Sequence, residues 1–124
     1  MLETGIIFTS SIVVSKQDCA VALGSGDLEV FATPAMVALM ENAAMNAVAQ
    51  ALPQGATTVG AEMNTTHIKP SVIGARVQAT ATLVAVDGRK LTFAVEAADE
   101  VGVIGEGTHV RYIVDRERFM AKLK

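Results

Sequence analysis

Three side chains, Thr33, Glu41 and His67, are of types that could carry out nucleophilic and acid–base chemistry. The Thr33 hydroxyl either caps a helix or faces a substrate at the positive end of that helix. Glu41 lies in an apolar stretch, where a carboxylate is costly unless it is paired, protonated or used in catalysis. His67 ends an extended segment, and a lone histidine is often structural. Each of the three residues therefore has both a structural and a catalytic interpretation.

The stretch that carries the first two residues is apolar on almost every side and predicts one long helix from Thr33 to Leu52. Thr33 is expected as the N-cap, Pro34 as the first helical residue, and Pro53 as the residue that stops the helix. Eight residues separate Thr33 from Glu41, which places them about 12 Å apart along the helix axis. Both residues therefore serve one reaction only if they surround the substrate or if the site uses two chains. A helix this apolar should also be covered by other structure on most sides.

The rest of the chain favours strands, because apolar and polar residues alternate in several segments bounded by turn residues. Residues 16–32 are expected to form a loop, Asp87-Gly88 predicts a tight hairpin turn, and residues 115–124 predict a short polar helix. The expected strands are 6–15, 57–68, 75–86, a segment through Leu91–Ala97, and 103–114. This order predicts an α+β chain with the hotdog fold, in which a curved antiparallel sheet of about five strands wraps a central helix. The whole chain, 1–124, is expected to be a single domain.

Two glycines, Gly105 and Gly107, occupy alternate positions on one face of the last expected strand. The same face carries His109 and Arg111. Missing side chains at two such positions indicate close approach by a ligand or by another stretch of backbone.

Composition restricts the class of protein. The 124 residues are 51% hydrophobic with a mean hydropathy of +0.40, which for a small domain indicates an apolar interface with another subunit. Basic and acidic residues are nearly balanced, so no nucleic acid is expected as a partner. No long uncharged apolar run or basic leader is present, so we expect no membrane span and a cytoplasmic protein.

Two histidines without clustered acids make a poor metal site, and the single cysteine, Cys19, is expected to be inert. No metal or other cofactor is expected.

Three segments together resemble the hotdog-fold thioesterases of the fluoroacetyl-CoA thioesterase type: EVFATPAMVALMENAA, TTHIKPSVIGARVQATATLVAVDGRKLTF and GEGTHVRYIVDRERFMAKL. The resemblance implies a homodimer, or a tetramer built from it, that hydrolyses acyl-CoA thioesters at sites in the dimer interface. It implies catalytic roles for Thr33, Glu41 and His67, which match the family in type and spacing. It also implies that the backbone N–H of Gly60 holds the thioester carbonyl and that Arg111 lies near CoA.

The chain departs from this family in the segment before the long helix. The fluoroacetyl-specific enzymes have phenylalanines there, whereas residues 22–29 read ALGSGDLE. Phe31, beside Thr33, is the nearest aromatic residue and is expected to contact the substrate. The sequence therefore predicts an acyl-CoA range that is broader than, or different from, fluoroacetyl-CoA. The alternative is a hotdog protein that binds acyl-CoA without hydrolysing it; a hotdog hydratase is disfavoured because its closely spaced Asp and His pair is missing.

Overall fold

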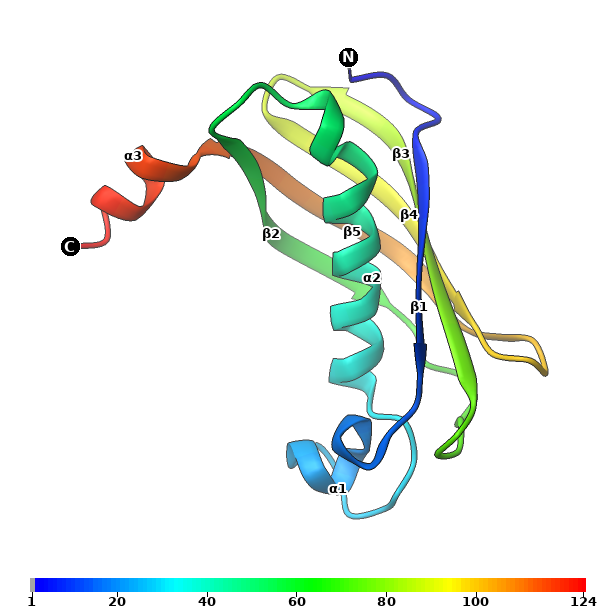
Figure 1. Ribbon diagram of the computed structural model, residues 1–124. Helices are drawn as coiled ribbons and strands as arrows, with labels where there is room; N and C mark the ends of the chain where they lie inside the picture. The colour runs from blue at the N-terminus through cyan, green and yellow to red at the C-terminus, as the bar shows by residue number, and fades with distance from the viewer. Residues whose placement is uncertain (1) are drawn as a thin grey trace.

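A five-stranded antiparallel sheet curls around one side of a long helix in the computed structural model, which describes residues 2–124 (Figure 1). This confirms the α+β class and the arrangement expected for a hotdog fold. Met1, the first residue of the expected domain, lies outside the described residues. The elements in chain order are β1 (Ile7–Val13), η1 (Lys16–Asp18), α1 (Ala20–Leu23), α2 (Thr33–Val48), η2 (Ala49–Ala51), β2 (Ala56–Thr65), β3 (Arg76–Asp87), β4 (Lys90–Ala98), β5 (Val103–Asp115) and α3 (Arg116–Ala121).

The order of strands in the sheet is β1-β3-β4-β5-β2. Strands β3, β4 and β5 form the expected meander, and Asp87 pairs with Lys90 across the predicted hairpin turn. Strand β2 pairs with β5, so β1 and β2 are the two edges of the sheet. The expected loop at residues 16–32 is instead partly helical and contains η1 and α1. Gly24, whose φ of +78° suits glycine, is the C-cap of α1.

The N-cap and the first helical residue of α2 each lie one residue earlier than the sequence predicts. Ala32, with an extended backbone, is the N-cap, so Thr33 is the first helical residue and Pro34 the second. The prediction that Thr33 caps the helix is therefore wrong, and its hydroxyl makes no capping hydrogen bond. The α-helix ends at Val48, and one 3₁₀ turn, η2, continues it to Ala51.

The core lies between α2 and the concave face of the sheet. The helix buries one face there, and β3 and β4 contribute the alternating apolar residues that the sequence pattern predicts. Ala85 is an exception, because a register shift between Leu83 and Ala85 turns it out to solvent. The fully buried core includes Met36, Met40, Ala43, Val77, Ala79, Leu83, Leu91 and Phe93.

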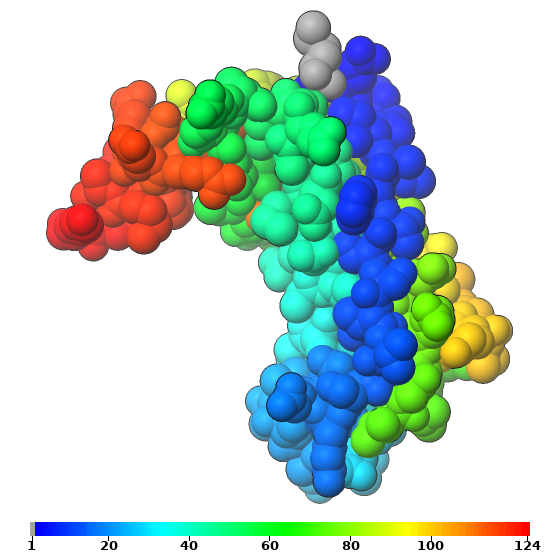
Figure 2. Space-filling view, viewed as in Figure 1, coloured from blue at the N-terminus to red at the C-terminus, as the bar shows by residue number. Residues whose placement is uncertain are grey.

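The opposite face of α2 is open, which differs from the expectation that the helix is covered on most sides. Pro34, Ala38 and Met45 are exposed on it, and Figure 2 shows this helix uncovered between the blue β1 and the green β2. The sheet of one chain is thus too narrow to enclose the helix, and an apolar strip remains at the surface.

Gly105 and Gly107 allow another stretch of backbone to approach β5. A methyl group at Gly105 would collide with the carbonyl oxygen of Thr66, and one at Gly107 would collide with that of Asn64. The segment after β2 thereby lies flat on β5, where the N–H of Thr66 donates to the carbonyl of Glu106 at 3.1 Å. Of the two interpretations of the glycine pair, the close approach is by backbone.

Candidate active site

Thr33 and His67, 34 residues apart in sequence, form a hydrogen-bonded pair. Thr33 Oγ1 lies 2.7 Å from His67 Nδ1. The hydroxyl is free to make this contact because Thr33 is inside the first turn of α2 and does not cap it. His67 comes from the segment that follows β2 and is held against β5 on both sides, since the N–H of Ile68 donates to the carbonyl of Ile104 at 2.7 Å. A hydroxyl beside an imidazole at this distance is the arrangement of a nucleophile and its base.

The surroundings of His67 keep its imidazole neutral. Burial lowers the pKa of His67, and the nearby backbone of Lys69 only partly opposes this. Phe31, which is 1% exposed, sets the edge of its ring against the imidazole with the two centroids 6.3 Å apart. Nε2 of His67 is buried and has no hydrogen-bond partner among residues 2–124.

A cavity of about 310 Å³ opens at this pair. Its wall combines apolar and polar side chains and includes one cation, Lys69. The lining residues include Ala20, Val30, Phe31, Thr33, His67 and Lys69.

The lowered pKa of His67 predicts the acid limb of the activity profile. Protonated His67 cannot accept the Thr33 proton, so kcat/KM should fall as the pH drops through the pKa of this histidine. Because burial disfavours the charged form, the midpoint of the fall should lie below about 6.5, the ordinary histidine value. Measurement of kcat/KM from pH 4.5 to 8 checks this. A midpoint above 7 would instead indicate an imidazolium stabilised by a nearby acid.

Glu41 belongs to a second group of polar residues, on the β2 side of α2. Its Oε2 lies 3.0 Å from the point that a Gly60 Cβ would occupy, and Arg111 Nη1 lies 3.4 Å from the same point. Gly60 is in the edge strand β2, beside the register shift between Gly60 and Glu62. Glu41 is half-buried, less covered than its apolar neighbours in sequence suggest. Glu41 and Gly60, which the resemblance had named separately, are thus brought together.

Arg111 is buried next to these two residues, with only 7% of its surface exposed. Its Nε donates to Thr58 Oγ1 at 2.7 Å and its Nη2 donates to the carbonyl of Thr58 at 3.0 Å. His109 is 1% exposed, and its Nε2 lies 3.2 Å from Arg111 Nη1. The sequence predicts that this histidine binds no metal and indicates no other role for it. A histidine two residues before an arginine on one face of a strand is the sequence signal that could have indicated this pair.

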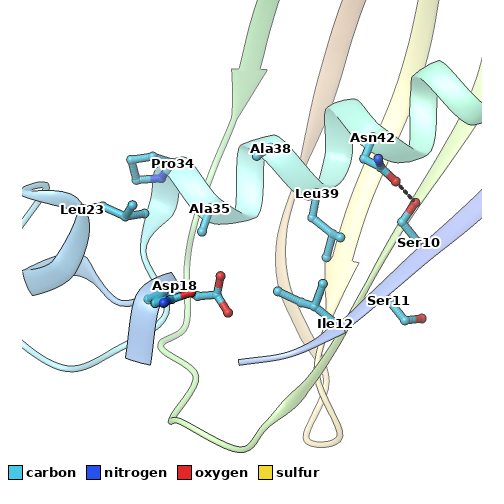
Figure 3. A pocket seen from close by; sticks show the side chains of 11 residues that line it. Ser10, Ser11, Ile12, Asp18, Leu23, Pro34, Ala35, Ala38, Leu39 and Asn42 are labelled. Atoms are coloured by element: carbon cyan, nitrogen blue, oxygen red, sulfur yellow. Dashed lines mark hydrogen bonds between the residues drawn. The ribbon is translucent and has the colours of Figure 1, made fainter. Parts of the chain in front are cut away.

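The two groups do not meet in one chain. About 12 Å of helix axis separates Thr33 from Glu41, and the geometry of one helix fixes that separation. Glu41 faces β2, whereas the next residue, Asn42, accepts a hydrogen bond from Ser10 of β1 at 2.7 Å (Figure 3).

A larger groove of about 570 Å³ runs between α2, β1 and the segment 16–23 (Figure 3). It contains none of Thr33, Glu41 and His67. Its residues include Ser10, Ile12, Asp18, Leu23, Pro34, Ala35, Ala38, Leu39 and Asn42. These three residues therefore lie outside this groove.

Residues 2–124 contain no group of three or more His, Cys, Asp or Glu side chains placed to hold a metal ion. Cys19 is buried, its thiol donates to the carbonyl of Ser15, and burial raises the pKa of that thiol. None of the described helices is long and apolar enough to cross a membrane.

A curled antiparallel sheet on a central helix is the architecture of the hotdog-fold thioesterases. Comparison with known proteins agrees. A family model described as fluoroacetyl-CoA-specific thioesterase, FlK, matches residues 14–117. The chain belongs to this family, and it is a thioester hydrolase.

Individual relatives give the extent of the similarity. The chain is 43% identical over 96 residues to a fluoroacetyl-CoA thioesterase of Streptantibioticus cattleyicolor, covering 77% of this chain and 69% of the relative. A solved structure of the thioesterase FlK superposes with a TM-score of 0.93 at 36% identity, covering 99% of this chain and 96% of that one. Variants of FlK have been crystallised with fluoroacetate and CoA, and with acetyl-CoA. A thioesterase superfamily member from Thermus thermophilus has a TM-score of 0.91 at 25% identity, covering 99% and 91% of the two chains.

Proposed function

We propose that the protein hydrolyses acyl-CoA thioesters, with Thr33 as the nucleophile and His67 as its base. The observation that carries this proposal is the 2.7 Å contact between the Thr33 hydroxyl and Nδ1 of a histidine whose pKa is lowered by burial. A neutral imidazole at hydrogen-bond distance can take the hydroxyl proton as the oxygen attacks.

In the first step the Thr33 oxygen bonds to the thioester carbonyl carbon and its proton moves to His67 Nδ1. The C–S bond then breaks, the sulfur of CoA takes that proton, and the acyl group remains on Thr33 as an ester. In the second step water attacks the ester carbonyl and gives its proton to a base, and the Thr33 oxygen is reprotonated as the free acid leaves. The Thr33 hydroxyl and a neutral His67 are thus restored.

Glu41 and Gly60 supply what the threonine–histidine pair lacks. The developing negative charge on the carbonyl oxygen needs a fixed donor, and the backbone N–H of Gly60 is suited to that position. Glu41, beside Gly60, is placed to take the proton of the attacking water. Because about 12 Å of helix axis separates Glu41 from Thr33, we propose that each complete site joins the pair of one chain to the Glu41 group of another.

The surface of the chain supports a dimer of this kind. One side of α2 is exposed and apolar at Pro34, Ala38 and Met45. The neighbouring strand β2 has one free edge, and unpaired edges of long strands readily pair with another chain. A second copy that covers α2 and extends the sheet at β2 would lie next to Glu41 and Gly60.

Met45→Lys is expected to convert the dimer to a monomer and to remove activity, because a charge in an apolar interface is left unpaired. Met45 is 37% exposed in the single chain. Val101→Lys is the matched control: Val101 is 77% exposed in the turn between β4 and β5, and this variant should remain an active dimer. Light scattering coupled to size exclusion checks both variants. A wild type that elutes as a 12.9 kDa monomer at micromolar concentration would contradict the dimer.

The acyl group is expected to extend beyond fluoroacetyl. Residues 22–29 carry no aromatic side chain, and their leucines, Leu23 and Leu28, are 49% and 65% exposed. Phe31 is occupied by packing on His67 and is too buried to act as a movable gate. The segment before α2 therefore has no bulky group to restrict the acyl pocket to a two-carbon unit.

Release of free thiol from a panel of CoA thioesters tests both the reaction and its range. The panel contains acetyl-, fluoroacetyl-, butyryl- and phenylacetyl-CoA, and we expect hydrolysis of several members. Strong preference for fluoroacetyl-CoA over acetyl-CoA would contradict the broad range. If CoA binds but no member is hydrolysed, the protein is an acyl-CoA-binding protein and the proposed reaction is wrong.

A further inference from the structure

Arg111 is a buried cation that forms no salt bridge within the described residues. Among residues 2–124 the one ion pair joins Lys16 and Glu29 at the surface, so Arg111 is not in contact with an acid. A buried charge is tolerated only when hydrogen bonds replace the water it has lost. Thr58 supplies two of these bonds, to Nε and Nη2, and His109 supplies the third: Nη1 lies 3.2 Å from His109 Nε2.

Two neighbours fix the tautomer of His109. Its Nδ1 lies 2.8 Å from the carbonyl oxygen of Glu62, which can only accept a hydrogen bond. Nδ1 therefore carries the proton, and Nε2 presents a lone pair. Arg111 has donors only, so its Nη1 donates to that lone pair. The orientation of the imidazole is thus determined from both sides.

The guanidinium that His109 holds faces the proposed catalytic carboxylate. Arg111 Nη1 and Glu41 Oε2 lie 3.4 Å and 3.0 Å from one point, the place of a missing Cβ at Gly60. His109 Cε1 is 3.4 Å from the same point. Because position 60 is glycine, no side chain of β2 stands between the carboxylate and the guanidinium.

We propose that His109 is a positioning residue, which orients the Arg111 guanidinium through an uncharged acceptor so that its full positive charge faces Glu41 and the acyl group. This proposal rests on the proposed hydrolase site. A carboxylate at position 109 would orient Arg111 equally well but would compensate its positive charge. The electrostatic interaction of Arg111 with Glu41 would then be weaker. A protonated histidine would lose its acceptor and repel Arg111. Burial and the charge of Arg111 both lower the pKa of His109, while the Glu62 carbonyl and Glu41 raise it, and the balance favours the neutral form that this role requires.

Three variants of His109 separate positioning from packing. His109→Gln keeps a neutral acceptor, and kcat should stay within about 3-fold of wild type. In His109→Glu the new side chain has the same shape as glutamine but carries a negative charge. Its kcat should be at least ~10-fold lower than that of the glutamine variant. His109→Leu removes the acceptor, and its kcat should fall by a similar factor. The assay uses the panel member that wild type hydrolyses fastest, and melting curves verify that each variant is folded.

A purely structural His109 gives another pattern. Equal activity of the glutamine and glutamate variants, or a glutamine variant as slow as the leucine variant, would overturn the proposal. A second readout does not depend on activity or on whether the glutamate variant folds. The chain has only two histidines, so ¹⁵N-histidine labelling with His67→Gln as the assignment control resolves each ring by NMR. We expect the Nδ1–H tautomer for His109 at pH 7.5; an Nε2–H or doubly protonated ring would overturn the proposal, even if the panel shows no hydrolysis and the proposed function fails.

Discussion

Thr33→Val should lower kcat at least ~10³-fold, because it removes the attacking oxygen and keeps almost the same shape. Valine matches threonine in size and in branching at Cβ, so the first turn of α2 should be preserved. His67 then remains in place with no hydroxyl at 2.7 Å. The loss should appear in kcat more than in KM, since the hydroxyl acts in the reaction and not in holding CoA. Steady-state thiol release, with the melting temperature of the variant as a folding check, measures it.

Thr33→Ser is the matched control for this experiment. Serine keeps the oxygen and loses only the methyl group, and its kcat should remain within about 10-fold of wild type. Rapid mixing of wild type should also show a burst of CoA if the acyl-threonine accumulates. A valine variant with near-normal turnover would show that water, and not Thr33, attacks the thioester, with Glu41 as its base.

The second large effect is expected from Glu41→Gln, which should lower turnover at least ~100-fold as the activating base is lost. Glutamine has nearly the same shape, so it keeps the packing beside Gly60. This variant also tests whether a complete site joins two chains, when it is combined with Thr33→Val.

Each variant alone should have little activity, yet a mixture of the two should regain activity. In a mixed dimer, one site has both substitutions and the other has neither, provided that Thr33 of one chain works with Glu41 of the other. Random exchange of subunits makes about half of the dimers mixed, so the recovered activity should approach about one quarter of wild type. Unfolding and refolding the two variants together, followed by thiol-release assays, provides the measurement. If Thr33 and Glu41 of the same chain form the site, every mixed dimer is damaged at both sites and the mixture stays inactive.

Much of the fold could be predicted from local patterns. The alternation in β3 and β4, the Asp87-Gly88 turn and the apolar helix are each encoded in a short window of sequence, and each was confirmed. The start of α2 shows the limit of such windows. A threonine followed by proline fits both an N-cap and a first helical residue, and the contact with His67, 34 residues away, is consistent only with the second.

The candidate site shows a different limit. Thr33, Glu41 and His67 could be selected by residue type, and their pattern matched a family. The surroundings of Arg111 could not be inferred in the same way, because Thr58 and Gly60 come from β2 while His109 and Arg111 come from β5. Which strand pairs with β5 is decided by the closure of the sheet, over about fifty residues of separation. The division of the polar residues into two groups likewise follows from the pitch of α2 and not from any motif.

Gly105 and Gly107 have a consequence for how variants of this protein should be read. They contact no residue of the proposed reaction, yet any side chain there would lift the segment that carries His67 away from β5. A small displacement of that segment would separate the imidazole from Thr33. In a mutational screen, both positions should therefore score with the active-site residues for activity, and substitutions at Gly105 should also lower abundance because a side chain there would press on the buried Met36. Two residues without a side chain would thus be indispensable to a catalytic distance that they do not themselves span.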